Sequence, residues 1–260
     1  MVQKVFNRVE KKYLLNEEQF QAVMGELKAY MEMDEYGLHT IRNIYFDTEN
    51  NELIRTSIEK PCYKEKFRVR CYGKPEEDSQ IFLEIKKKYK GIVNKRRITM
   101  TRTAARAYLL ENEKPKQMGQ IEREIDYFLA HYDLKPALYL AYDRIALFGK
   151  KDQEFRVTFD QNIRSRREHL VLDDDTNTVP LLEEGYHLME VKITDAMPLW
   201  FVDILSRYEI RNVSFSKYGT IYLNNLVAGA YEYGTKNTVI HTTDTENYAN
   251  CVLQGVMVSA

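Results

Sequence analysis

Basic side chains alternate with apolar ones at every second position in six short segments of this chain. In one of them, Lys66, Arg68 and Arg70 occupy one parity, whereas Phe67 and Val69 occupy the other. Period two is the repeat of a β-strand, whose successive side chains point to opposite faces of a sheet. The chain is therefore predicted to build sheets with one apolar face and one cationic face.

In the other five segments, the polar side chains at alternate positions are also mostly basic. They carry Arg8, Glu10 and Lys12; Glu84, Lys86 and Lys88; Arg144; Arg156, Thr158 and Asp160; and Glu190 and Lys192. An ordinary solvated face mixes both charge signs, so this segregation indicates a focused positive field. Because 38 basic residues are balanced by 39 acidic ones, the chain is not basic all over, which argues against a nucleic-acid partner.

The composition favours a reduced, intracellular protein with one large core. The 260 residues are 44% hydrophobic, and the three cysteines are an odd number without zinc-type spacing. No stretch approaches the roughly 20 apolar residues that span a bilayer, and the charged N-terminal residues lack the apolar region of a signal peptide. We expect a soluble, cytoplasmic protein without a transmembrane segment, which could still associate with a membrane protein partner.

Turn residues and periodicity divide the chain into strands and helices. Strands are predicted over 2–14, 39–46, 63–72, 81–89, 93–101, 138–148, 154–163 and 187–193. Helices are predicted over 17–31 with Asn16 as N-cap, over 51–57, over 103–131 with a break near Pro115 and Gly119, over 199–208 and over 216–226. Residues 164–180 are predicted as an exposed polar loop.

This order of elements predicts an α+β fold, an antiparallel β-barrel with helices packed outside and a wet, cationic lumen. We assign residues 1–226 to this single domain. Residues 227–260 differ in pattern and are taken as a C-terminal tail of uncertain order.

No glycine-rich phosphate loop is present, so side chains must hold any phosphate chain that binds. Arginine offers a planar, bidentate fork to phosphate oxygens, whereas lysine acts as a compact point charge. The candidates for these two roles are Arg68, Arg70, Arg144 and Arg156, and Lys12, Lys86, Lys95 and Lys192. Taken alone, each of these residues would be interpreted as an ordinary surface charge. Because they lie on the polar face of several strands, they are more consistent with a binding face.

Three glutamates lie on the same parity as the cations. For Glu84 the favoured interpretation is that it neutralises neighbouring basic residues. Glu190 has two open interpretations, charge neutralisation or coordination of Mg²⁺ or Mn²⁺, because a metal bound to polyphosphate needs only one or two protein carboxylates. Glu10 is a second, weaker metal candidate. The five histidines show no metal-ligand spacing, and no nucleophilic triad is supported.

Taken in order, eight short motifs of this chain resemble the VTC domain, the polyphosphate polymerase domain of the vacuolar transporter chaperone complex, within the triphosphate tunnel metalloenzyme superfamily. The resemblance covers about residues 4 to 226. The motifs are Arg8-Val9-Glu10-Lys11-Lys12-Tyr13, Ile44-Tyr45-Phe46-Asp47, Lys66-Phe67-Arg68-Val69-Arg70, Phe82-Leu83-Glu84-Ile85-Lys86, Tyr142-Asp143-Arg144, Phe155-Arg156-Val157-Thr158-Phe159-Asp160, Met189-Glu190-Val191-Lys192 and Ser214-Phe215-Ser216-Lys217-Tyr218.

The resemblance implies a tunnel barrel that moves the γ-phosphate of ATP onto a growing polyphosphate chain, with Mn²⁺ or Mg²⁺ as cofactor. It implies that Glu190 is the carboxylate that binds the metal ion. It also implies a set of phosphate ligands, most of them also catalytic: Lys12, Arg68, Arg70, Lys86, Arg144, Arg156, Lys192 and Lys217. A further basic position is Lys95 or Arg96, and parity with Thr99 favours Lys95 and Arg97. Two departures from the family pattern are Ser214, where a further lysine is common in eukaryotic members, and Arg8, where the triphosphatase branch has a glutamate.

The first function hypothesis is therefore an ATP-dependent and metal-dependent polyphosphate polymerase. The alternatives are a tunnel triphosphatase that hydrolyses inorganic or nucleoside triphosphate, and a non-catalytic module that binds polyphosphate or nucleotide. Fewer carboxylates and more cations favour retention of a phosphate chain over a two-metal hydrolytic site.

Overall fold

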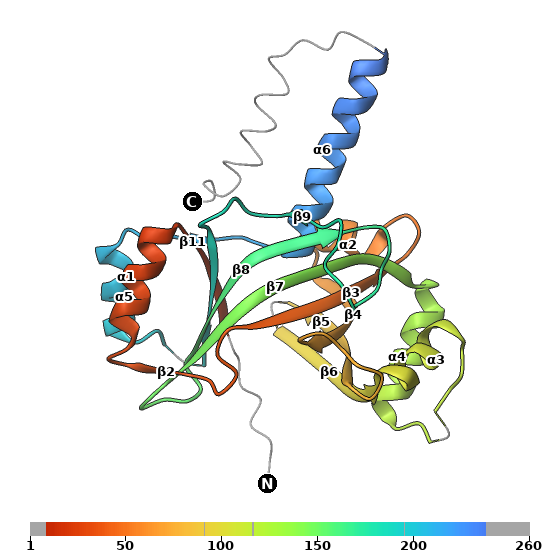
Figure 1. The fold of residues 1–260 in the computed structure, drawn as a ribbon, viewed down its shortest axis with the longest axis horizontal. Coiled ribbons are helices and arrows are strands. Elements are labelled where there is room, and N and C mark those ends of the chain that lie inside the picture. The colour runs from red at the N-terminus through yellow and green to blue at the C-terminus, as the bar shows by residue number, and fades with distance from the viewer. Residues whose placement is uncertain (1–8, 91, 116, 195, 238–260) are drawn as a thin grey trace. The chain divides into compact units, whose positions relative to one another are not determined.

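The computed structural model describes residues 9–90, 92–115, 117–194 and 196–237, with side chains up to residue 228 (Figure 1). Its helices are α1 (Glu17–Leu27), α2 (Glu52–Ile58), α3 (Arg102–Leu110), α4 (Gln120–Tyr132), α5 (Leu199–Arg207) and α6 (Lys217–Asn237). Its strands are β1 (Val9–Leu15), β2 (Met31–Met33), β3 (His39–Asp47), β4 (Tyr63–Tyr72), β5 (Gln80–Tyr89), β6 (Ile92–Thr101), β7 (Lys135–Gly149), β8 (Arg156–Arg166), β9 (Val179–Pro180), β10 (His187–Ile193) and β11 (Asn212–Val213).

The strands form one hydrogen-bonded sheet of 11 strands in the order β11-β1-β10-β8-β7-β3-β4-β5-β6, with β2 paired to β7 and β9 to β8. The registers of β1 with β10, of β3 with β4 and β7, and of β5 with β4 and β6 are all antiparallel. The predicted antiparallel sheet is confirmed. Over the described residues its hydrogen bonds do not close into a ring, because the path ends at β11 and β6.

The chain divides into two compact units. The first comprises the described parts of residues 1–32, 147–159 and 185–260, and the second comprises residues 33–146 and 160–184. Residue 226, the predicted end of the domain, lies inside α6, which continues to Asn237. Arg8 and residues 238–260 of the predicted tail lie outside the described residues, so the domain boundary stays a prediction.

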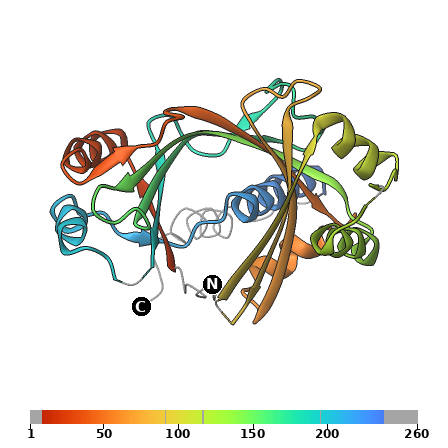
Figure 2. The same ribbon diagram turned by 90° about the horizontal axis from the view of Figure 1, so that it is seen from below.

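In the second unit, the apolar parity of the sheet forms a core with α3 and α4. Phe67 of β4, Leu83 and Ile85 of β5, and Ile125 of α4 are each fully buried in one cluster. Figure 2 shows α3 and α4 on the same side of β4–β6. The alternation read from the sequence therefore directs every second side chain towards the helices and leaves the basic parity on the opposite face.

In the first unit, α1 and α5 cover the apolar parity of β1 and β10. Leu15 and Val191 are fully buried, and the ring of Phe20 stacks on that of His187 at 3.8 Å. The predicted N-cap is confirmed, since the Asn16 side chain accepts a hydrogen bond from the Gln19 amide at 2.8 Å and the Gln19 side chain accepts one from the Asn16 amide. The helix ends at Leu27, earlier than predicted, because residues 31–33 form β2.

The prediction of an exposed loop over residues 164–180 is correct only in part, because residues 167–178 form a loop but most of them are half-buried. β8 continues to Arg166, which is buried although it is charged. Its guanidinium donates hydrogen bonds to four backbone carbonyls of the loop, at His169, Val171, Asp174 and Thr176. Polarity suggested exposure, whereas these hydrogen bonds fold the segment around one buried arginine.

Asp175 attaches the same loop to the sheet. Its carboxylate accepts hydrogen bonds from Arg42 of β3 at 2.8 Å, from Arg164 of β8 at 3.0 Å and from the hydroxyl of Tyr139 of β7. Burial alone would raise the pKa of Asp175, but the hydrogen bonds from Arg164, Tyr139 and Arg42 lower it to about 2. This carboxylate therefore stabilises the fold chiefly when it is ionised.

No described helix combines the length and the apolar character needed to cross a bilayer.

We predict that Asp175→Asn lowers the free energy of unfolding by about 1–3 kcal/mol at pH 7, because it leaves buried donors without a charged acceptor. The Asp175 pKa is depressed, so its contribution is complete above about pH 4 and is lost as the pH falls through about 2. In urea titrations, the difference between wild type and variant should shrink over this window. Asp133→Asn, at a carboxylate that is 87% exposed, is the control and should change little. A difference that does not vary with pH would contradict this role of Asp175.

Candidate functional site

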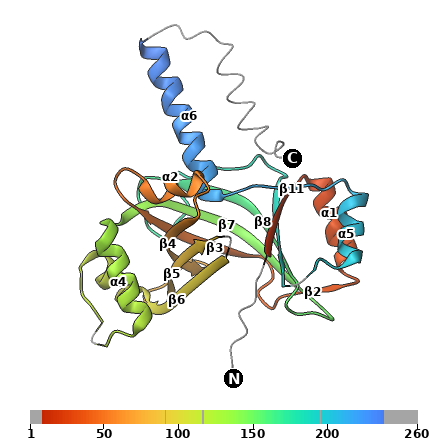
Figure 3. The same ribbon diagram turned by 180° about the vertical axis from the view of Figure 1, so that it is seen from behind.

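The basic parity of β4, β5 and β6 forms a continuous cationic face in the second unit. The register places Lys66 beside Lys86 and Lys86 beside Lys95, while Glu84 lies between Arg68 and Arg97. Figure 3 shows these three strands side by side next to β3. The parity argument for Lys95 and Arg97 is confirmed. Arg96 points to the other face, where it forms an ion pair with Glu124 of α4 at 3.4 Å.

Glu84 is the centre of this face. Its carboxylate, only 2% exposed, lies 2.7 Å from Nη2 of Arg68, 2.8 Å from Nζ of Lys95 and 2.8 Å from Nε of Arg97. Burial alone would raise the pKa of Glu84, but the charges of Arg68, Arg70 and Lys95 hold it far below its usual range. The interpretation of Glu84 as a neutralising residue is confirmed.

Polar side chains of β3 and β7 position Arg68 and Arg70 of β4. Arg68 donates to the Tyr45 hydroxyl at 3.0 Å, and Arg70, which is buried, donates to the side chain of Asn43 at 2.9 Å and to the Tyr142 hydroxyl at 3.0 Å. Burial raises the pKa of Tyr45, but the charges of Arg68, Lys66 and Arg70 outweigh it and lower the value to about 8. Both forks are therefore held in place before any ligand arrives.

Two groups of this face have a pKa lowered to about 8. Besides Tyr45, partial desolvation and the positive charges of Arg68 and Arg97 lower the pKa of Lys95 to about 8, although Glu84 opposes the shift. The total charge of the face consequently changes between pH 7 and pH 9.

Arg144 makes a bidentate ion pair with an internal carboxylate. Its Nε and Nη2 atoms lie 2.6 and 2.8 Å from the two oxygens of Asp160, which is fully buried. The fork that the resemblance assigns to phosphate therefore already has an acceptor. Asp160 shares the polar parity of β8, but its pairing with a strand neighbour could be recognised only in the structure.

The first unit carries a second group of charges, on β1 and β10. Lys12 Nζ donates a hydrogen bond to the carbonyl of Phe215 at 2.8 Å and lies 4.0 Å from one carboxylate oxygen of Glu190. The other carboxylate oxygen of Glu190 lies 3.6 Å from Nζ of Lys192. In the antiparallel register Glu10 is opposite Lys192 and Lys12 is opposite Glu190. Glu10 and Glu190 are thus diagonal neighbours on one face.

The remaining predicted cations of this unit lie at the ends of elements. Arg156 is the exposed first residue of β8, and its Nε donates to the carbonyl of Gln153 at 3.3 Å. Lys217 is the half-buried first residue of α6, directly after Ser216, whose hydroxyl accepts from the Gly219 amide at 3.2 Å.

The described residues hold no group of three or more histidine, cysteine or acidic side chains that could bind a metal ion. Glu10 and Glu190 together supply two carboxylates on one face, flanked by lysines. Such a pair suits a divalent ion whose other ligands come from phosphate and water, and it does not suit a cage made only by protein.

An aromatic group continues the cationic face beyond Arg70. Tyr72 follows Arg70 on the same parity of β4 and packs edge-on against Phe82 at 5.4 Å, with His39 at 6.0 Å. The Arg97 guanidinium lies 4.5 Å from the centre of the Phe82 ring. The alternation of residues 66–72 could have placed Tyr72 on the cationic face from the sequence alone. This tyrosine is 45% exposed and offers a ring surface beside the cations.

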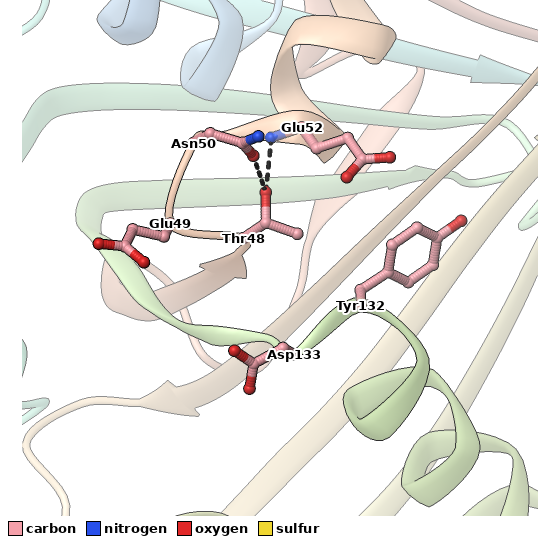
Figure 4. Close-up of a pocket in the computed structure, with 6 residues that line it drawn as sticks. All are labelled: Thr48, Glu49, Asn50, Glu52, Tyr132 and Asp133. Carbon is pink, nitrogen blue, oxygen red and sulfur yellow. Dashed lines mark hydrogen bonds between the residues drawn. The ribbon is translucent and has the colours of Figure 1, made fainter.

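A separate open hollow of about 380 Å³ lies where β3 leads into α2 (Figure 4). The Thr48 hydroxyl donates to the side chain of Asn50 and accepts from the Glu52 amide, and Glu49 and Asp133 also line the hollow. Its acidic lining is unsuited to phosphate, so this hollow is not the candidate site.

The fold and the two groups of charges together define a class. An antiparallel sheet with lysine and arginine on its polar face and helices on its apolar side is a tunnel-like sheet, so the predicted fold class is confirmed, although hydrogen bonds among the described strands do not close a barrel. In the fold comparison, a candidate adenylate cyclase of known structure from Bacillus halodurans gives a TM-score of 0.52 at 18% identity, covering 80% of this chain and 93% of that one.

Residues 7–224 match the VTC domain family, and the chain belongs to that family. It is 26% identical over 216 residues to vacuolar transporter chaperone complex subunit 4 of Trypanosoma brucei brucei. The match covers 68% of this chain but only 27% of that relative.

We predict that Glu84→Gln lowers the free energy of unfolding by about 3–5 kcal/mol, because Arg68, Lys95 and Arg97 lose the buried charge that holds them together. Added inorganic triphosphate should recover more stability in the variant than in wild type, since it replaces the missing negative charge. Thermal melts with and without triphosphate measure both effects. The control, Glu77→Gln, removes an 80% exposed carboxylate and should behave as wild type. A variant as stable as wild type without ligand would contradict this account.

We also predict that triphosphate affinity falls as the pH rises from 7 to 9. Lys95 loses its positive charge and Tyr45 gains a negative one, each through a pKa of about 8, so both titrations weaken anion binding. Lys95→Arg and Tyr45→Phe should each flatten the profile in part, and the double variant should flatten it further. Titration calorimetry at constant ionic strength measures the profile. An unchanged slope in the double variant would show that other groups control it.

Proposed function

We propose that this protein is a polyphosphate polymerase that transfers the γ-phosphate of ATP to a growing polyphosphate chain. The observation that carries the proposal is the packing of Arg68, Lys95 and Arg97 around one buried carboxylate, in a chain of the VTC family. Arg70, Lys66 and Lys86 lie on the same face of the sheet as these groups, so this face suits a ligand with several adjacent negative charges.

Catalysis in this proposal consists of positioning and charge neutralisation. Phosphoryl transfer needs little covalent assistance from a protein, and preorganised cations stabilise the charge on the transferring group. Arg68 and Arg70 are fixed by Tyr45, Asn43 and Tyr142, so little reorganisation is required when phosphate binds. The lysine rows, including Lys86 and Lys192, would hold the product chain without demanding one geometry.

A nucleotide donor is supported by the aromatic residues beside Arg70. β4 places Tyr72, Arg70 and Arg68 on one face at steps of about 6.7 Å, so a base at Tyr72 leaves the phosphates beside the two arginines. Inorganic triphosphate would leave the exposed Tyr72 ring unused.

Mn²⁺ or Mg²⁺ is part of the proposal. Glu190, with Glu10 as its diagonal neighbour, would hold the ion through one or two carboxylate ligands while phosphate oxygens complete its coordination. The bound ion would reduce the repulsion between phosphate groups.

A triphosphatase is the second candidate, because hydrolysis needs the same cations and a positioned water. The small number of carboxylates on the described cationic faces favours transfer over two-metal hydrolysis. The third candidate is a module that binds polyphosphate or nucleotide without turnover. A cytoplasmic location and a membrane protein partner also belong to the proposal, and the relative's designation as a complex subunit supports a protein partner.

We predict that the protein incubated with ATP and Mn²⁺ or Mg²⁺ forms long polyphosphate chains, with a shorter lag when a polyphosphate primer is added. Gel electrophoresis resolves the products. Lys86→Gln and Lys192→Gln should each reduce the rate at least tenfold, because each removes a cation from a proposed phosphate row. Lys135→Gln, at a 60% exposed lysine paired with Asp133, should leave the rate unchanged.

The other outcomes separate the candidates. Orthophosphate and ADP without polyphosphate chains would identify a triphosphatase, and tight triphosphate binding without turnover would identify a binding module. Glu190→Gln tests the metal role, since it should raise the Mn²⁺ concentration needed for half-maximal rate while metal-free nucleotide binding persists. An unchanged Mn²⁺ requirement would remove Glu190 from that role.

A further inference from the structure

An exposed patch of the first unit combines aromatic, apolar and basic side chains. We define the docking patch as Lys28, Tyr30, Lys150, Lys151, Leu199 and Trp200, contributed by the chain after α1, the turn after β7 and the start of α5. None of these residues belongs to the cationic faces described above.

Leu199 and the two aromatic rings form the apolar part of the patch. Leu199, the first residue of α5, is 86% exposed. The rings of Tyr30 and Trp200 stack 4.2 Å apart and nearly parallel, at 5°. Trp200 is supported from within the unit by edge contacts with Phe155 and Phe201 at 5.6 and 5.5 Å. The exposed Leu199 thus directly precedes, along α5, the tryptophan of a stacked aromatic pair.

The lysines are held next to this apolar group by the backbone. The amide of Lys150 donates to the carbonyl of Tyr30 at 2.9 Å, and its ammonium donates to the carbonyl of Lys28 at 2.8 Å. Lys151 is exposed and adjacent. Within the part of the chain that the structure describes, none of the three forms an ion pair, and the acidic Glu26 and Asp203 of the same unit pair with Arg207.

We propose that the docking patch attaches this protein peripherally to the anionic surface of a lipid bilayer. Tryptophan and tyrosine favour the interfacial layer, where an apolar ring meets water, and an exposed leucine gains by entering the acyl region. Unpaired lysines add attraction to anionic headgroups. A patch of this size gives weak, reversible and salt-sensitive binding, unlike a spanning segment.

The charges favour a membrane over a second copy of the chain. A two-fold symmetric contact through this patch would bring the lysines of both copies together, which costs electrostatic energy. An anionic surface removes that repulsion.

The test uses the full chain and vesicles of phosphatidylcholine, with or without 30% phosphatidylserine, in the presence of saturating triphosphate. Triphosphate occupies the phosphate-binding faces, so they cannot contribute to lipid binding. Trp200 is the only tryptophan of the sequence, so its fluorescence reports on the patch directly. We expect a blue shift and quenching by brominated lipid with phosphatidylserine vesicles, and co-sedimentation that decreases at high salt.

The variants Leu199→Gln and the double variant Lys150→Gln with Lys151→Gln should each reduce co-sedimentation at least fivefold. The matched controls are Leu110→Gln, at a leucine that is 63% exposed in the other unit, and Lys74→Gln with Lys135→Gln. Both controls should bind as wild type. Polymerase activity without lipid should be unchanged in all these variants, so failure of this proposal and failure of the proposed function are distinguishable.

The proposal would be overturned by an unshifted Trp200 spectrum, or by equal vesicle binding of the patch variants and wild type. It would also fall if size-exclusion chromatography showed a dimer that Leu199→Gln dissociates, because the patch would then bind a second copy.

Discussion

Repulsion between like charges is the constraint on which this structure depends. Arg68, Lys95 and Arg97 lie within hydrogen-bonding distance of the same carboxylate, that of Glu84. Without a shared anion, cations this close in a partly desolvated place would force the strands that carry them apart. The register of β4, β5 and β6 brings Glu84 between them, so the sheet can present a dense positive surface and still fold without a ligand.

The same device recurs at other positions with different consequences. Asp160 is fully buried and accepts hydrogen bonds from both Nε and Nη2 of Arg144, so these two donors are engaged within the protein. Glu190 lies 3.6 Å from the ammonium nitrogen of Lys192 and 4.0 Å from that of Lys12, so its ion pairs are longer than those of Glu84 and Asp160. Internal carboxylates therefore bind the cations at different distances, a difference that counting charges in the sequence does not reveal.

A scaffold on the apolar side and in the loops keeps the charged strands in register. α3 and α4 bury one parity of β4–β6, and a slip of one residue would place arginines in that core. Asp175 and Arg166 attach residues 164–180 to the sheet through ion pairs and carbonyl contacts rather than through apolar burial. The positions of the phosphate-binding candidates thus depend on interactions that do not themselves touch a ligand.

The sequence by itself determined which residues face each side of a strand. Side chains alternate at period two, so β4 has the predicted bounds, β3 and β5 nearly so, and Lys95 and Arg97 were assigned to the cationic face without coordinates. The Asn16 cap was equally readable, because a capping box is a local interaction. Pairing between strands is not local. That Asp160 engages Arg144, that Glu84 gathers three cations, and that the polar segment 164–180 folds around Arg166 were decided by tertiary structure, since each depends on which distant backbone segments become neighbours.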